Sequence, residues 1–477
     1  MATTRKPERS LPVLASTKSV AVEAIADHAR RRAVQPGIPY LTSYGGGLDS
    51  VYVAERFIRE PHLRPFALAD WTLVMSQTGD EFRDIADYHD KAGVLQDFAA
   101  AATFSDRAES VTGPRFVQIA RSGPCGSSMR VLEDSLTPTA LLVEGDYKLA
   151  DEMISAGSLP TTTGNRKCSL KSKGSIIDST VRDYLGLSTF YHSFGFDRDE
   201  THRIARSEAA IAERNFSRQG LRRAGMDFSV ENPWWLDAPE AFVGEMGDYP
   251  MLRWDVSRAA ASTWLEATLG SASPRSCCRY CPFQRPWADQ TVLERWREEP
   301  AHLVARDLLM EYQALGLNPR MQLFFQKGTL REWVEAARAT DAIAAFESLL
   351  DSVPFALWRV RRIFGSTTTK KGREQRTAKR RTEKLVIGSR LEMELLFDEV
   401  YSRGLEVTEQ NGFRYAFRRE QDRALTETSE ELFVVAPALA DEKMNSSAFE
   451  QQWHDLHPDA EVPDGESVQP LLLAVCA

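Results

Sequence analysis

The chain has 477 residues, of which 43% are hydrophobic and 27% charged, and its formal net charge at pH 7 is −9. This length predicts two or three domains with buried cores, and the acidic balance excludes a uniformly basic nucleic-acid binder. No apolar stretch reaches the roughly 20 residues that a membrane-spanning helix needs, and no long apolar run follows the first charges as in a secretory signal. We therefore expect a cytoplasmic protein without a membrane partner.

Strand-like and helix-like segments alternate after residue 36. Such alternation, with helices of this length, predicts an α/β fold in which helices cover both faces of a mostly parallel, doubly wound sheet. The strand-like segments are 37–44, 70–78, 114–121 and 188–196, and the helix-like segments are 50–60, 81–102, 174–186 and 199–213.

The pattern changes twice along the rest of the chain. It becomes helical from about residue 287 to 350, and a helix over 389–404 and a hairpin over 405–420 follow later, the hairpin turned at Asn411 and Gly412. We expect an N-terminal extension, a nucleotide-binding α/β domain, a helical extension, a basic linker or arm and a small C-terminal α+β domain. Their expected bounds are 1–35, 36–300, 301–350, 351–388 and 389–477.

A strongly basic segment lies inside the expected linker. Residues 359–384 carry eleven Lys or Arg and two Glu, a local net charge of +9. Such a run is most often a solvated linker, but it can also follow a phosphate backbone. Both interpretations stay open, and the second predicts contact with DNA or RNA.

The most informative short stretch is "SYGGGLDS", residues 43–50, between a predicted strand and a predicted helix. Glycines let backbone N–H groups approach an anion at a helix N-terminus, whose dipole favours negative charge. A tight turn that needs positive φ is the alternative explanation. A Walker loop is excluded because no G-x-x-x-x-G-K-[ST] occurs in the chain.

This loop resembles the S-G-G-x-D-S loop of the PP-loop ATP pyrophosphatases, in the three-glycine variant of the phosphoadenosine-phosphosulfate reductase-like branch. Gly45 stands where that loop usually has serine, and Ser43 is the nearest hydroxyl before it. The resemblance implies an adenine nucleotide alpha hydrolase-like fold that binds ATP and Mg²⁺. The residues it implies for the ATP phosphates and the metal are Ser43, Gly45, Gly46, Gly47, Asp49 and Ser50.

Further blocks are similar to this branch in the same order, over roughly residues 36–300. "TGDE" matches its Thr-Gly turn beside the nucleotide, with Gln77 in place of the usual aspartate. The blocks "RKCSLKSKG", "FGFDRDETHR", "YPMLRW" and "CCRYCPF" follow. The resemblance adds Thr78, Gly79, Glu81, Lys173 and Glu200 to the nucleotide site and Arg203 to the catalytic residues Asp49 and Ser50. For Lys173 and Arg203 a solvated surface charge is the alternative.

The six cysteines are unevenly spread. Cys278 and Cys281 have a chelating spacing, Cys277 adds a neighbouring thiol, and soft thiolates select zinc or an iron–sulfur cluster. The resemblance adds Cys168 and favours a 4Fe–4S cluster over zinc. Whether Cys277 is a ligand stays open, and a purely structural metal knot is the alternative. Cys125 and Cys476 show no partners in the sequence.

Together these features predict an enzyme that forms AMP and pyrophosphate from ATP and sulfurates a nucleic-acid substrate, as the DNA phosphorothioation sulfurtransferases do. A sulfur donor such as a cysteine desulfurase would be a partner. A sulfonucleotide reductase is one alternative, although Cys476 lacks the E-C-G-x-H surroundings of that activity. A non-catalytic nucleotide-sensing subunit is another. The acceptor, the sulfur donor, the oligomeric state and the role of the C-terminal domain stay open.

Overall fold

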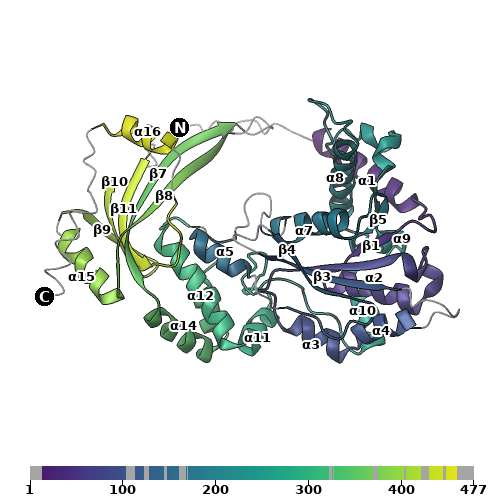
Figure 1. Cartoon of the computed structure of the whole chain (residues 1–477), viewed down its shortest axis with the longest axis horizontal. Helices are drawn as coiled ribbons and strands as arrows, with labels where there is room; N and C mark the ends of the chain where they lie inside the picture. Colours follow the sequence, from purple (N-terminus) through teal and green to yellow (C-terminus); the bar gives the residue numbers. More distant parts are fainter. Residues whose placement is uncertain are drawn as a thin grey trace, which may run out of the picture. The chain divides into compact units, whose positions relative to one another are not determined.

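The structure is a computed structural model, and it describes residues 13–103, 113–122, 128–143, 148–160, 168, 170–321, 325, 327–368, 374–401, 404–419, 429–443 and 447–458. The chain divides into two compact units (Figure 1). The first unit combines residues 1–147 with 168–278, and the second combines residues 148–167 with 279–477. No helix in the described ranges is both long and apolar enough to cross a membrane.

The first unit is an α/β fold around a mixed, mostly parallel sheet of six strands in the order β4-β3-β2-β1-β5-β6. All neighbouring pairs are parallel except β3 and β4, which form an antiparallel edge. The strands are β1 (Tyr40–Ser43), β2 (Trp71–Gln77), β3 (Arg115–Ser122), β4 (Ser128–Ser135), β5 (Phe190–Ser193) and β6 (Glu245–Asp248).

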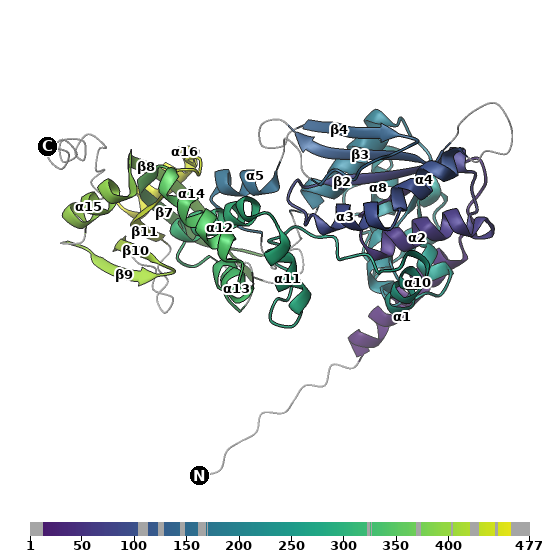
Figure 2. The same cartoon turned by 90° about the horizontal axis from the view of Figure 1, so that it is seen from below.

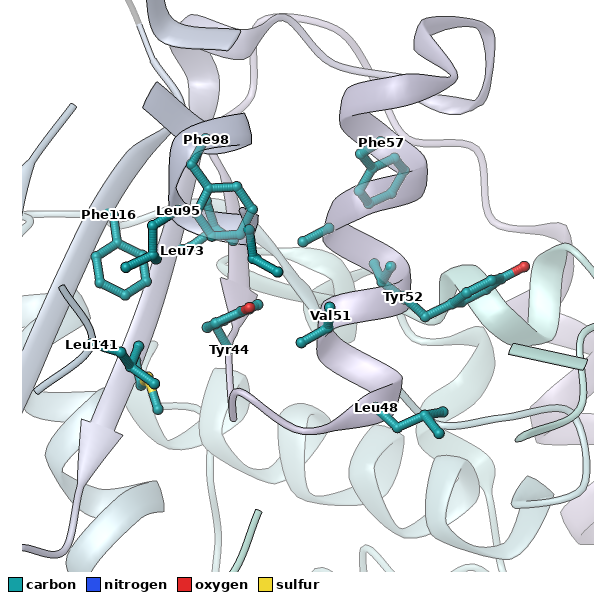
Figure 3. Close-up of a cluster of buried hydrophobic side chains, with 14 of the residues drawn as sticks. Tyr44, Leu48, Val51, Tyr52, Phe57, Leu73, Leu95, Phe98, Phe116 and Leu141 are labelled. Carbon is teal, nitrogen blue, oxygen red and sulfur yellow. The ribbon is translucent and has the colours of Figure 1, made fainter. Parts of the chain in front are cut away.

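Helices cover both faces of this sheet, as Figures 1 and 2 show. On one face Leu73 and Phe116 pack against Val51 of α2 and Phe98 of α4, in the cluster drawn in Figure 3. On the other face Val74 and its neighbours pack against the α7 region. The helices are α1 (Val13–Arg31), α2 (Leu48–Arg59), α3 (Asp84–Lys91), α4 (Val94–Thr103), α7 (Ser175–Ser179), α8 (Thr201–Arg218), α9 (Pro250–Arg253) and α10 (Arg258–Leu269).

The predicted strands over 37–44, 70–78, 114–121 and 188–196 are all present as β1, β2, β3 and β5, and the sequence pattern missed the two edge strands β4 and β6. The predicted helix over 81–102 is two helices, because Gly93 adopts φ +71° between α3 and α4. The predicted helix over 174–186 is shorter, with one π-helical segment on each side of α7, Leu170–Gly174 and Thr180–Tyr184.

The N-terminal segment differs from the expected extension over residues 1–35. Its described part contains α1, in which Ile25 and Ala29 are buried and pack into clusters with residues of α8. Residues 20–31 therefore contribute to the core of the first unit. Residues 1–12 lie outside the described residues.

The second unit has a separate antiparallel sheet in the order β8-β7-β11-β10-β9. Asn411 and Gly412 adopt φ +53° and +77° between β9 and β10, which confirms the predicted hairpin turn. The strands are β7 (Phe355–Thr368), β8 (Glu374–Gly388), β9 (Glu406–Gln410), β10 (Phe413–Arg419) and β11 (Ser429–Pro437). The helices are α5 (Leu149–Ala156), α11 (Gln290–Glu298), α12 (Ala301–Gly316), α13 (Leu330–Ala336), α14 (Thr340–Ser352), α15 (Arg390–Val400) and α16 (Ser447–Leu456).

The expected basic linker or arm over 351–388 is wrong for its described residues, because they form β7 and β8 of this sheet. Its arginines are paired inside the unit. Arg359 binds Glu431 at 2.7 Å, Arg362 binds Glu430 at 2.7 Å, and Arg361 binds Glu450 at 3.0 Å. The expected boundaries at 300, 350 and 388 do not separate compact units either, because residues 279–477 belong to one unit.

Candidate nucleotide site

The glycine loop lies where the chain order of the sheet changes direction. After β1 the chain adds β2 and β3 on one side of that strand and later adds β5 and β6 on the other. Ligands of open α/β sheets bind beyond the carboxyl ends of the strands at such a position. Ser43 ends β1 there, and Leu48 begins α2 directly after the three glycines.

Two of the three glycines are required by the local geometry. Gly46 has φ +69°, and a Cβ atom on it would lie 3.1 Å from side-chain atoms of Ile85 and Met75. A Cβ atom on Gly47 would lie 3.1 Å from that of Ser276. Gly45 is different, because the nearest atom to an added Cβ is Ser50 Oγ at 3.9 Å. The run of glycines therefore serves both a positive-φ turn and a close approach of the backbone to its surroundings.

Hydroxyl groups hold this loop in place. The Ser50 hydroxyl donates to the Gly47 carbonyl at 3.0 Å and accepts from the Gly45 N–H at 3.2 Å. The Ser273 hydroxyl donates to the Gly46 carbonyl at 3.0 Å. These bonds fix the path of the backbone between β1 and α2, so that its N–H groups face a constant direction.

Asp49 is the polar residue at the start of α2 that is least satisfied by the protein. Its Oδ2 atom lies 3.5 Å from Arg258 Nη1, and its Oδ1 atom is buried and accepts no hydrogen bond from the described residues. Burial raises the pKa of Asp49 to about 6, although the charge of Arg258 opposes that shift. A buried carboxylate oxygen without a donor is suited to a cation or a water molecule.

A cavity of about 380 Å³ opens at this loop. Its described lining includes the loop residues, two aromatic rings and four basic side chains, an arrangement suited to an anionic ligand with an apolar portion. The lining residues are Ser43, Gly45, Gly47, Leu48, Asp49, Ser50, Lys173, Phe194, Gly195, Phe196, Arg203, Arg258, Arg275 and Ser276.

Arg203 and Glu200 lie together beside this cavity. Arg203 forms an ion pair with Glu200, and its guanidinium lies 4.2 Å from the centre of the Phe196 ring. Arg203 lines the cavity and is half exposed, whereas Glu200 is not part of the described lining. Of these two expected site residues, the arginine can therefore reach a ligand directly, and the glutamate positions it.

The predicted segment Thr78, Gly79 and Glu81 lies against a different partner. Thr78 Oγ1 is 3.2 Å from Cys278 Sγ, and Glu81 forms an isolated β-bridge with the same cysteine. Glu81 also forms an ion pair with Lys173, which does line the cavity. None of the three predicted residues is in the described lining of the cavity. Lys173 thus connects the segment around Cys278 with the glycine loop.

The structure describes four of the six cysteines, all as free thiols. Cys277 is buried, and Cys168, Cys278 and Cys281 are half-buried. Cys278 ends the first unit and Cys281 belongs to the second. Within the described ranges, no three His, Cys, Asp or Glu side chains are gathered as a metal site. Their convergence on one cluster stays a prediction, and Cys125 and Cys476 lie outside the described residues.

Several site residues were missed by the sequence reasoning. Arg258 and Arg275 line the cavity, and His192 lies 2.7 Å from Ser43 Oγ. The signal for His192 was an ionisable residue inside a strand segment rich in aromatic residues. The two arginines carried no local signal, because their positions depend on how residues 258–276 return to the glycine loop.

No family model, curated protein or solved structure matches the chain.

Proposed function

We propose that the first unit binds ATP at residues 43–50 and forms AMP and pyrophosphate, in an adenine nucleotide alpha hydrolase-like, doubly wound fold of the PP-loop type. One observation carries this proposal. The unpartnered, buried Oδ1 of Asp49 lies at a glycine loop, at a helix N-terminus and beside a cavity with four basic side chains.

The residues divide the work by their chemistry. Backbone N–H groups of residues 46–50 and the dipole of α2 would bind the phosphate oxygens, because the Gly45 N–H already donates to Ser50 Oγ. Lys173, Arg203, Arg258 and Arg275 would neutralise the pyrophosphate as its charge develops. Asp49 would hold Mg²⁺, which when bound polarises the phosphoryl oxygens. Phe194 and Phe196 offer apolar surface to the base or ribose.

The proposal extends to sulfur transfer through the cysteines. If the four thiols of Cys168, Cys277, Cys278 and Cys281 converge, as predicted, they would form a soft donor set that suits a 4Fe–4S cluster better than a hard cation. Thr78 and Lys173 lie near this set, and Lys173 also lines the ATP cavity. We therefore propose that activation and sulfuration occur at neighbouring positions, with a protein persulfide donor such as a cysteine desulfurase.

A nucleic-acid acceptor is proposed only as the type of substrate that the motif resemblance suggests. Within the basic segment over 359–384, Arg359, Arg361 and Arg362 are paired with acidic residues of the second unit, so a contact with DNA or RNA would have to use its other basic side chains. The acceptor interpretation therefore depends on nucleotide analysis of cellular DNA and RNA, which would detect a sulfur-substituted nucleotide.

The test is pyrophosphate release from ATP by the purified chain. We expect Asp49→Asn to reduce release by at least about 100-fold, because the metal loses its carboxylate, with a melting temperature at neutral pH no lower than that of the wild type, because the amide removes a buried charge. Asp199→Asn is the matched control. Asp199 is a largely exposed carboxylate between Phe196 and Arg203, which line the cavity, but it is not in the described lining itself. Wild-type release by Asp49→Asn would contradict the proposal, and ATP binding without any turnover would favour a nucleotide-sensing subunit.

A further inference from the structure

A second polar arrangement beside the loop is not used by the proposal above. The side chains of Ser43, His192 and Glu245 come from the adjacent strands β1, β5 and β6. Ser43 Oγ lies 2.7 Å from His192 Nε2, and His192 Nδ1 lies 2.7 Å from Glu245 Oε1. The three residues form a continuous hydrogen-bonded chain from the interior of the sheet to the cavity.

Strand register produces this chain. Leu41 pairs with His192 across β1 and β5, and Phe190 pairs with Glu245 across β5 and β6. Side chains two residues apart on a strand share a face, so Ser43, His192 and Glu245 all point to the face that α7 and α8 cover. From Glu245 to His192 to Ser43, each residue lies two positions further toward the carboxyl ends of the strands. Ser43 therefore lies at the edge of the sheet where the cavity opens.

The protonation states of the chain follow from the partners of Glu245. Burial alone would raise the pKa of Glu245, but hydrogen bonds from His192 and Arg214 lower it to about 2, so the carboxylate stays ionised. An ionised carboxylate can only accept, and therefore His192 Nδ1 carries a proton. In the neutral ring His192 Nε2 is then the acceptor, and the Ser43 hydroxyl donates to it.

Only one end of the chain reaches the cavity. His192 and Glu245 are buried, and Ser43 is in the lining of the cavity. A nearby arrangement provides the contrast: the Tyr44 hydroxyl lies 2.6 Å from His89 Nε2, and His89 Nδ1 lies 2.6 Å from the Ile85 carbonyl. That second chain has no carboxylate and no residue in the described lining, so its role is structural.

We propose that Ser43 is a nucleophile toward phosphorus, with His192 as its general base and Glu245 as the positioning residue. A serine that donates to a histidine held by a carboxylate is the arrangement of activated hydroxyls. Gly45, where the PP-loop pattern has serine, leaves Ser43 and Ser50 as the hydroxyls of the loop that line the cavity. Ser50 is already committed to the loop backbone.

The formation of the bond to Ser43 needs no reactant other than ATP. The choice of ATP as the electrophile rests on the proposed function, whereas the activation of Ser43 does not. Ser43 Oγ forms a bond to the α-phosphorus, the bond from that phosphorus to the bridging oxygen breaks, and pyrophosphate leaves. The serine proton moves to His192 Nε2. A deprotonated acceptor oxygen or sulfur then displaces Ser43 from the AMP group, and the proton returns from His192 to Ser43. The basic side chains of the cavity would stabilise the phosphorane-like transition state.

A fluorophosphonate probe tests the nucleophile without relying on ATP. The probe reacts with base-activated serines, forming an O–P bond as fluoride leaves. We expect labelling at Ser43, located by peptide mass spectrometry, and its loss in Ser43→Ala. We expect His192→Gln to slow labelling by about 100-fold or more, the range of a lost general base. His89→Gln is the matched control, a buried histidine with equally short hydrogen bonds, and should label as the wild type does.

The outcomes separate this inference from the proposed function. Labelling at Ser43 that ATP prevents supports both, and ATP–pyrophosphate exchange without acceptor should then occur in the wild type and not in Ser43→Ala. Pyrophosphate release without any labelling of folded wild-type protein at Ser43 overturns the nucleophile and leaves the ATP proposal standing. Labelling without pyrophosphate release supports the nucleophile and rejects ATP as its electrophile. Equal labelling in His192→Gln, with melting temperatures unchanged, overturns the role of the base.

Discussion

Arg258 Nη1 lies 3.5 Å from Asp49 Oδ2, and the second carboxylate oxygen of Asp49 points into buried space without a hydrogen-bond donor among the described residues. The arginine is half exposed, so its charge offsets the cost of burying Asp49 only in part. The carboxylate is therefore held ready for a cation by a balance between burial and one nearby charge.

The pH dependence of nucleotide binding follows from this balance. Because the pKa of Asp49 is about 6, its carboxylate is charged above that pH and protonated below it. We expect the affinity for MgATP, measured by calorimetry between pH 5 and 8, to fall as pH decreases through about 6. Arg258→Gln should shift this fall to higher pH, since the arginine lowers the pKa. Arg198→Gln, at a half-exposed arginine paired with Asp255, is the control and should leave the pH profile unchanged.

Substitution of the first two loop glycines should have unequal effects. Gly46→Ala places a Cβ at φ +69° and 3.1 Å from Ile85, and we expect it to lower the free energy of unfolding by about 1–2 kcal/mol. Gly45→Ala meets nothing closer than 3.9 Å and should change that free energy by less than about 0.5 kcal/mol. Urea denaturation of both variants checks this, and equal losses would mean that the loop adopts another conformation.

Glu55 should make the protein more stable as pH falls. This side chain of α2 is fully buried and paired with Arg59, and burial raises its pKa to about 7. The folded state therefore binds a proton more readily than the unfolded state, so stability increases as pH falls from about 7 toward the ordinary pKa. Glu55→Gln should raise the free energy of unfolding at pH 8 by roughly 2–3 kcal/mol and by much less near pH 5.

Chemical denaturation at both pH values measures this difference. The control is Glu60→Gln, at a better-solvated carboxylate paired with Arg56 at the end of the same helix. Glu55→Gln could instead change the free energy of unfolding by the same amount at pH 8 and at pH 5. That result would contradict the raised pKa and would show that the carboxylate is well solvated or fully paired.

Arg362 should behave as a core residue of the second unit. It donates to Glu430 at 2.7 Å and to the Leu317 carbonyl at 3.0 Å, and it is 5% exposed. Glu430 also pairs with Arg320, so Arg362→Met would leave this buried carboxylate with one arginine instead of two and should cost about 2 kcal/mol of unfolding free energy. Lys379→Gln, at an exposed position of the same basic segment, should cost almost nothing. An unchanged melting curve for Arg362→Met would restore the interpretation of a solvated arm.

Metal analysis decides the role of the cysteines. Protein purified without oxygen should contain iron and sulfide, and Cys278→Ala should lose both, because cluster irons need their thiolate ligands. The iron content of Cys277→Ala tests whether Cys277 is the fourth ligand of the cluster. Cys125→Ala is the control, because that cysteine belongs to no ligand motif. Stoichiometric zinc without iron would reject the cluster and leave a structural knot.

The sequence identified features that depend on a few neighbouring residues. The hairpin at Asn411 and Gly412 was predictable because both residues tolerate positive φ, and the strands β1, β2, β3 and β5 were predictable from apolar runs between turns. The glycine loop was predictable for the same reason, since backbone conformation at Gly46 depends mainly on the residue itself. The break at Gly93 carried a similar local signal, which the helical pattern around it concealed.

Tertiary structure alone decided features that depend on distant pairing. The +9 segment has the composition of a linker, yet its described residues lie in two long strands, and Arg359, Arg361 and Arg362 pair with Glu431, Glu450 and Glu430 from distant parts of the sequence. The chain from Ser43 through His192 to Glu245 exists because strand register aligns three residues separated by up to 202 positions in the sequence. Local propensity determines which backbone conformations a segment can adopt. Whether its charges are buried and how its strand is aligned depend on distant ion-pair partners and neighbouring strands, which only the folded chain brings together.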